Sequence, residues 1–150
     1  MTFKTMKACS KAYKEDNDCT VIALAIGGGI SYDLAHKIMK ANGRKKGKGA
    51  LNHSREKNVP LNNAFNSLGF TLRKVPQKTI KSKSLMALTR DIKTKETLIV
   101  YTGGWRGPNH VTVYKNGVCE DWAAQSRKRI ISVYLVRKET TMTHAWEARR

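Results

Sequence analysis

The sequence has few acidic residues. Eleven Asp and Glu stand against 29 Lys and Arg in 150 residues, so the formal net charge is +18 at pH 7. An excess of this size creates a strong positive surface potential, which attracts nucleic acid, acidic proteins or anionic membrane surfaces. A solvated coat of lysines is the plainer interpretation, and composition alone does not choose among these.

Long apolar runs are also missing. The longest covers residues 20–26, far short of the roughly 18 consecutive apolar residues that a membrane-spanning helix needs, and residues 1–12 do not resemble a secretory leader. Three cysteines are few and odd in number, which argues against a disulfide framework. We therefore expect a protein with no membrane contact in a reducing cytoplasm.

Metal-binding and nucleotide-binding motifs are absent as well. The three Cys and four His show no C-x₂-C or H-x₃-H spacing, and the glycines at 27–29 and 103–107 are not followed by Gly-Lys-Ser/Thr. Zinc binding and a P-loop are excluded on these grounds. We expect neither a metal nor a cofactor.

The patterns that are present predict helices first and strands later. An apolar run at 21–26 predicts a helix capped by Asp16, Asn17 or Asp18 and stopped by the glycines at 27–29. Helical spacing also predicts helices at 31–42, 60–68 and 84–92, and alternation predicts strands at 70–75, 97–101, 110–115, 118–123 and 131–136. This segregation predicts one α+β domain over residues 1–150, with 1–12 and 139–150 loosely held at its ends.

Cys19 falls in the first turn of the first predicted helix. Unsatisfied backbone N–H groups and the positive helix end favour a thiolate there. A cysteine beside an apolar run is more often buried filler, so this position alone decides nothing.

A predicted hairpin brings a histidine near a carboxylate. Asn-Gly at 116–117 is a strong two-residue turn signal, and it pairs strand 110–115 with strand 118–123. His110 and Asp121 then share one face as diagonal neighbours about 7–8 Å apart at the backbone, close enough for the carboxylate to hold the imidazole. The opposite face is predicted to be the core side, with Val111, Val113, Val118 and Trp122. The alternative is a surface histidine with an ordinary charged neighbour.

The order of these parts resembles the papain-like cysteine peptidase superfamily, and in particular small phage and bacterial papain-like proteins. The matching segments are Asn17-Asp18-Cys19, Ser31-Tyr32-Asp33, Gly43-Arg44-Lys45-Lys46-Gly47, and Asn109-His110 to Asp121-Trp122. They span most of residues 13–136. The resemblance implies N-terminal helices packed on a C-terminal antiparallel sheet.

The resemblance also implies roles for the site residues. Cys19 would attack an acyl carbon, His110 would hold and donate the proton, and Asp121 would fix the imidazole tautomer. Papain-like peptidases usually place a Gln several residues before the Cys as an oxyanion-hole donor; none lies between residues 1 and 19, so Asn17 is the candidate. Thr20 stands where many relatives carry a small residue, which predicts a narrower cleft.

Two basic segments are candidates for contact with a polyanion. They comprise Arg44, Lys45, Lys46 and Lys48 in a glycine-interrupted loop, and Arg127, Lys128 and Arg129. Neither is interleaved with aromatic residues, so sequence-specific recognition is not indicated. Solvated loops are the alternative for both.

Three functions remain open at this point. The first is a cysteine hydrolase, a peptidase or isopeptidase acting on a protein or peptide. The second is an inactive papain-like protein that binds nucleic acid or an acidic host protein through its charge, in host takeover or anti-defence. The third is a peptidoglycan amidase, which uses the same chemistry but needs export.

Overall fold

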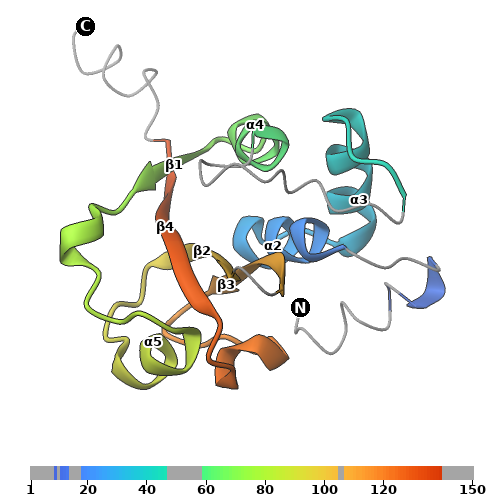
Figure 1. Ribbon diagram of the computed structural model, residues 1–150. Coiled ribbons are helices and arrows are strands. Elements are labelled where there is room, and N and C mark those ends of the chain that lie inside the picture. The colour runs from blue at the N-terminus through green and yellow to red at the C-terminus, as the bar shows by residue number, and fades with distance from the viewer. Residues whose placement is uncertain (1–8, 10, 14–17, 47–58, 105–106, 140–150) are drawn as a thin grey trace, which may run out of the picture.

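The computed structural model of the chain describes residues 9, 11–13, 18–46, 59–104 and 107–139. Within them the chain is α+β, as predicted, with helices before most of the strands (Figure 1). The helices are α2 (Cys19–Gly28), α3 (Tyr32–Ala41), α4 (Val59–Ser67) and α5 (Leu85–Asp91), with 3₁₀ turns η1 (Gln77–Thr79) and η2 (Trp122–Gln125). The strands are β1 (Phe70–Lys74), β2 (Thr97–Gly104), β3 (Gly107–Tyr114) and β4 (Arg129–Lys138).

The four strands form one antiparallel sheet in the order β1-β4-β2-β3. The central strands β4 and β2 are the most apolar, since both of their edges and both of their faces are covered. β3 therefore lies at an edge of the sheet, beside β2, where Thr102 pairs with His110. This edge position places His110 where another element can reach it.

Each face of the sheet has its own hydrophobic core. One core combines α2, α3 and α4 with alternate residues of the strands, among them Ile99 and Tyr101 of β2 and Val113 of β3. The other core combines Leu85 of α5 with the intervening residues, among them Val100 and Tyr114. Because successive side chains of a strand point to opposite faces, β2 and β3 contribute to both cores.

The centre of the first core is α2, which is buried along nearly its whole length. Gly29 at φ 67° ends this helix in the left-handed conformation, whereas Gly27 and Gly28 lie inside it. A Cβ on Gly27 would come within 2.9 Å of Phe65 Cζ, so this glycine permits α4 to pack close to α2. The prediction that all three glycines stop the helix is therefore wrong for the first two.

The caps of α3 and α5 follow the sequence patterns. Ser31 accepts a hydrogen bond from the N–H of Leu34 (3.1 Å), and Ser84 accepts one from that of Ala87 (3.2 Å). Gly43 has the positive φ (99°) expected of a residue that ends a helix. Leu34 itself is exposed, because the buried stripe of α3 is formed by Tyr32, Ala35 and Met39.

The predicted hairpin is confirmed at its turn and wrong in its strands. Asn116 (φ 55°) and Gly117 (φ 79°) form the two-residue turn, and Lys115 and Val118 exchange both backbone hydrogen bonds (2.9 and 3.0 Å). Beyond that bridge the chain leaves the sheet, and β3 pairs with β2 instead. Val118, expected in the core, is consequently exposed.

The predicted loose ends fall mostly outside the described residues, which omit 1–8, 10 and 140–150. Cys9 and Tyr13 are described, and both pack against the first core. Among the described residues no single helix is long and apolar enough to cross a bilayer; α2 and α3 reach that length only as a pair bent by 118°.

Candidate active site

Cys19 is the first residue of α2, as predicted. Its thiol is free and half-buried, so it is neither sealed in the core nor fully exposed. The first turn of a helix presents backbone N–H groups that have no intrahelical partner. A nucleophile at this position therefore has hydrogen-bond donors directly beside it.

The residue before Cys19 is held by α3. Asp18 occupies the N-cap position, but its side chain does not bond the first turn of α2. Its carboxylate instead accepts a hydrogen bond of 2.8 Å from the hydroxyl of Tyr32, and both side chains are buried. The start of α2 is thus anchored by a buried hydrogen bond, while the N–H groups of the first turn are not taken up by Asp18.

One end of α2 contacts β3, and the other contacts the residue that follows β3. At the C-terminal end, Lys115 Nζ donates to the carbonyl of Ile26 (3.1 Å), placing a positive charge where the helix dipole is negative. At the N-terminal end, Cys19 lies close enough to His110 that its side chain helps to raise the pKa of the imidazole. Helix and strand therefore run alongside one another in the same direction, which fixes the thiol opposite the ring.

His110 also contacts Asp121 through its other side. Nε2 lies 2.5 Å from Asp121 Oδ2, and the two side chains are 16% and 6% exposed. Because Nε2 is occupied by the carboxylate, Nδ1 is the ring nitrogen that remains for Cys19. A thiol, an imidazole and a carboxylate, predicted from segments far apart in the sequence, are thus brought together in this order.

The position of Asp121 does not depend on a strand. Its backbone carbonyl accepts the N–H of Ala124 (2.9 Å) at the start of η2. The hydroxyl of Thr89 on α5 donates to the carbonyl of Ala124 (2.8 Å), and Tyr114 Oη on β3 lies 2.6 Å from Thr89 Oγ1. The segment that carries Asp121 is therefore held by α5 and β3 together, and the predicted pairing of strand 110–115 with strand 118–123 is not what places it.

The electrostatics of the site favour a protonated imidazole. Burial lowers the pKa of His110, but hydrogen bonds and charges from Asp121 and Cys19 outweigh burial and raise this pKa to about 9. Opposite charges close to a group stabilise its charged form. Near neutral pH His110 is therefore an imidazolium, with Asp121 accepting a hydrogen bond from Nε2–H.

The other two cysteines differ from Cys19. Cys119 Sγ lies 3.2 Å from Thr112 Oγ1, and burial raises the pKa of this thiol. Cys9 packs against the core. Neither thiol has an imidazole partner like that of Cys19 among the described contacts, so both serve as internal comparisons for its reactivity.

The remaining predicted site residues are not gathered here. Asn17 and Lys48 lie outside the described residues. Thr20 is fully buried, and its hydroxyl has no hydrogen-bond partner among the described atoms, so the expected narrowing of a cleft by Thr20 is wrong. Arg44, expected in an exposed loop, is only 5% exposed, because its backbone folds back onto the end of α3 (N–H to Met39 carbonyl, 3.0 Å).

The other predicted basic residues are more accessible. Lys45 and Lys46 are exposed, as are Arg127 and Arg129, while Lys128 is half-buried. Among the described residues, no group of three or more His, Cys, Asp and Glu is arranged to hold a metal ion.

Sequence reasoning missed two supports of the site. Asp18 and Tyr32 lie in segments that resemble papain-like proteins, but nothing local indicates that they bond each other across 14 positions. The link from Tyr114 through Thr89 to Ala124 joins three segments and has no sequence signature. A hydroxyl on an apolar strand face, as at Tyr114, was the available hint, since buried tyrosines need a partner.

No protein-family model, curated protein or solved structure matches this chain. The site is therefore characterised by its own geometry and chemistry.

Proposed function

We propose that this protein is a cysteine hydrolase of the papain-like type, a peptidase or isopeptidase that acts through Cys19, His110 and Asp121. The observation that supports it is the chain of contacts from a half-buried thiol at a helix start, through an imidazole, to a buried carboxylate. A nucleophile, a base within hydrogen-bond reach and a group that orients the base are what covalent acyl transfer requires.

In the first half of the reaction the thiolate sulfur of Cys19 attacks the carbonyl carbon of an amide. The C=O π electrons move to the oxygen, and backbone N–H groups in the first turn of α2 are suitable donors to that oxyanion. The imidazolium of His110 then gives its proton to the departing amine as the C–N bond breaks. Asp121 keeps the ring oriented and its charge balanced throughout.

In the second half, water replaces the amine. Neutral His110 takes a proton from water as the water oxygen attacks the thioester carbon, and the C–S bond breaks to restore the thiolate. The protonated His110 is thereby regenerated, and the acid is released. Every proton passes through one ring nitrogen, Nδ1, because Nε2 stays on Asp121.

Selective labelling of Cys19 tests this proposal. A thiol-reactive acyl probe at neutral pH, followed by peptide mass mapping, should modify Cys19 faster than Cys9 and Cys119, whose environments lack the imidazolium. His110→Ala should abolish that selectivity. His36→Phe is the matched control, because it removes an imidazole of α3 while keeping a ring against Tyr13 and Tyr32, and it should leave labelling unchanged. Equal labelling of the three cysteines, or full selectivity in His110→Ala, would count against a hydrolase.

The alternative, an inactive papain-like protein that acts by charge, predicts no turnover of any amide substrate and no dependence of its activity on Cys19. The assembled thiol, imidazole and carboxylate favour the hydrolase.

A further inference from the structure

Two basic segments that are distant in the sequence lie side by side. The chain entering α5 runs antiparallel to the chain entering β4: Ile130 N–H donates to the carbonyl of Lys83 (2.9 Å), and Leu85 N–H donates to that of Lys128 (3.0 Å). Ser84 and Arg129 form a bridge between them. The Gln77 side chain, bonded to the Ile131 carbonyl (3.3 Å), holds η1 against β4 as well.

This pairing brings exposed basic residues of the two segments into one region of the molecule. We call it the cationic face, and it consists of Lys78, Lys81, Lys83, Arg127 and Arg129. Residues 71–90 and 122–138 contain no Asp or Glu at all. Within the described part of the chain these five side chains enter no ion pair, in contrast to Arg90 with Asp91 and Arg137 with Glu96.

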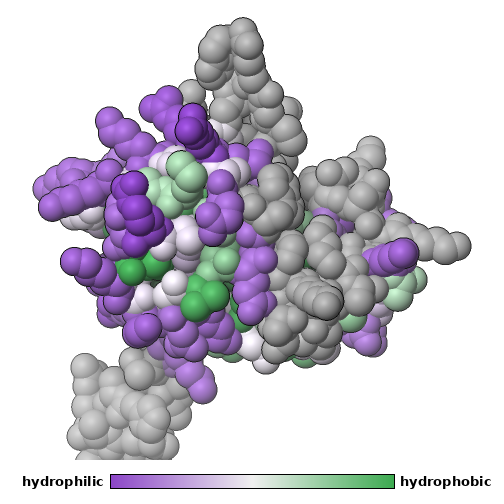
Figure 2. Space-filling model, turned by 90° about the horizontal axis from the view of Figure 1, so that it is seen from below, coloured by the Kyte–Doolittle hydropathy of each residue, from purple (hydrophilic) through white to green (hydrophobic). Residues whose placement is uncertain are grey.

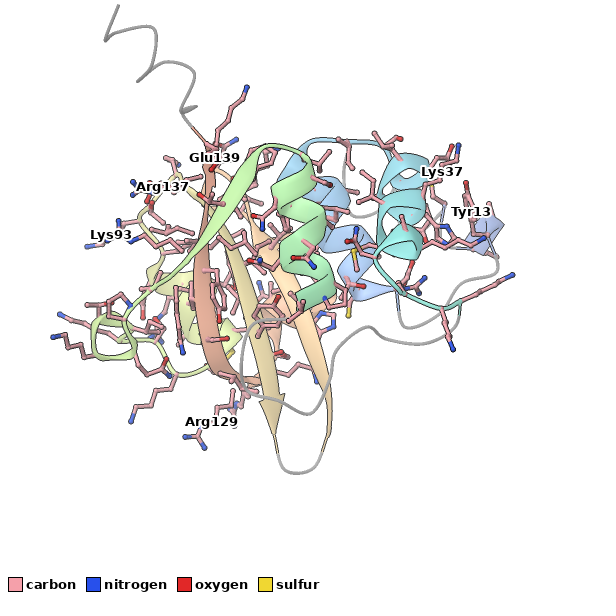
Figure 3. All side chains as sticks on the ribbon, turned by 90° about the horizontal axis from the view of Figure 1, so that it is seen from above. Tyr13, Lys37, Lys93, Arg129, Arg137 and Glu139 are labelled. Carbon is pink, nitrogen blue, oxygen red and sulfur yellow. The ribbon has the colours of Figure 1, made fainter. Side chains whose placement is uncertain are left out.

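The figures place this surface in the molecule. Figure 2, seen from the side on which α5 lies in Figure 1, shows hydrophilic side chains over most of the described part of that face, around small apolar areas. In Figure 3 the side chain of Arg129 points away from the sheet at the lower edge of the view, and Lys37 on α3 lies well apart from it, at the right. The cationic face is thus separate from the basic residues of α3.

We propose that the cationic face binds the phosphate backbone of nucleic acid without regard to sequence. Phosphate contacts are made chiefly by Lys and Arg, and the release of counterions supplies the affinity. Protein interfaces, by contrast, are depleted in Lys and are built around aromatic or apolar residues, and residues 77–84 and 126–130 contain no aromatic side chain. The same lack of aromatics leaves no stacking platform for bases, so the contact is with the backbone.

The test compares two triple variants that remove the same charge. Lys81→Gln/Lys83→Gln/Arg129→Gln alters the cationic face, and Lys37→Gln/Lys40→Gln/Lys45→Gln alters exposed residues of α3 and the loop after it. Each variant lowers the net charge of +18 by three. Binding of the full chain to a short fluorescent DNA duplex is measured by anisotropy from about 50 to 200 mM salt, and circular dichroism verifies that both variants fold.

The cationic-face variant should bind about 10- to 100-fold more weakly at 0.15 M salt, and its plot of log K against log salt should be shallower by about 3, one unit for each lost contact. The α3 variant should change the affinity several-fold at most. Equal losses in both variants, a larger loss in the α3 variant, or no DNA binding alongside binding to an acidic protein such as polyglutamate would each overturn the proposal. The titration is repeated with Cys19→Ala, which should bind DNA with the same affinity as the native sequence. DNA binding and hydrolysis are thereby tested independently.

Discussion

Replacing Asp121 by Asn removes one charge from the site while keeping the shape of the side chain. Asp121 accepts the hydrogen bond from His110 Nε2, and the carboxylate is almost fully buried. An amide oxygen can still accept that bond, so the ring should stay in place. The change therefore isolates the electrostatic contribution of Asp121 to the protonation of His110.

The size of the effect follows from the pKa of His110. Burial lowers this pKa, yet partners raise it from 6.5 to about 9. The difference corresponds to about 3 kcal/mol in favour of the imidazolium, at about 1.4 kcal/mol per pKa unit. In the Asn variant burial still lowers the pKa of His110, but the charge of Asp121 no longer raises it. The pKa of His110 should therefore fall toward or below its ordinary value.

The folded-state pKa of His110 is raised, so the protonated ring stabilises the fold. This stabilisation is fully present below about pH 6.5 and is lost as the pH rises through about 9. The free energy of unfolding of the native sequence should therefore decline over that window, by up to about 3 kcal/mol. In Asp121→Asn the free energy of unfolding should change less with pH, because the pKa of His110 would differ little between the folded and unfolded states.

NMR titration of the histidine ring protons measures the pKa directly, and urea unfolding at several pH values measures the stability. Glu120→Gln is the matched control, because it removes a neighbouring, exposed carboxylate. A His110 midpoint near 6.5 in the native sequence would refute the reasoning. So would a midpoint that stays at about 9 in Asp121→Asn or drops equally in Glu120→Gln.

Two further substitutions test how the site is supported. Gly27→Ala should destabilise the fold by about 1–3 kcal/mol in urea unfolding, because the new Cβ would lie 2.9 Å from Cζ of the fully buried Phe65. Adding Phe65→Leu should recover part of the loss, and a simple helix-propensity gain from alanine would contradict the packing argument. Tyr32→Phe should cost about 1–3 kcal/mol and slow the labelling of Cys19, because it leaves the buried Asp18 carboxylate without its hydroxyl donor. Tyr13→Phe, whose hydroxyl bonds Asp33 at an exposed position, is the control and should do neither.

Local features of the fold were the most predictable. Ser31 and Ser84 cap helices as their patterns indicate, and Asn116-Gly117 adopts the positive φ values that its sequence favours. Such features depend on residues within a few positions of one another. The helix start at Cys19 belongs to this group. Asp18 occupies the predicted N-cap position, although its side chain makes no capping hydrogen bond.

Pairings between distant segments were less predictable. The turn at 116–117 suggested that 118–123 would continue the sheet, yet β3 takes β2 as its partner. The closeness of His110 and Asp121 was expected for that reason, and it arises instead from η2 being held by Thr89 and Tyr114. Likewise, nothing local shows that Arg44 is buried or that Lys83 lies beside residue 130.

The sequence by itself determined the α+β composition, the helix that begins at Cys19, the tight turn and the excess of positive charge, because each depends on residue type or on near neighbours. Tertiary structure alone decided that the thiol meets His110, that a 3₁₀ turn delivers Asp121, and that two basic segments form one face. Those outcomes depend on which apolar surfaces bury one another across the whole chain, since packing brings together groups that no local pattern relates.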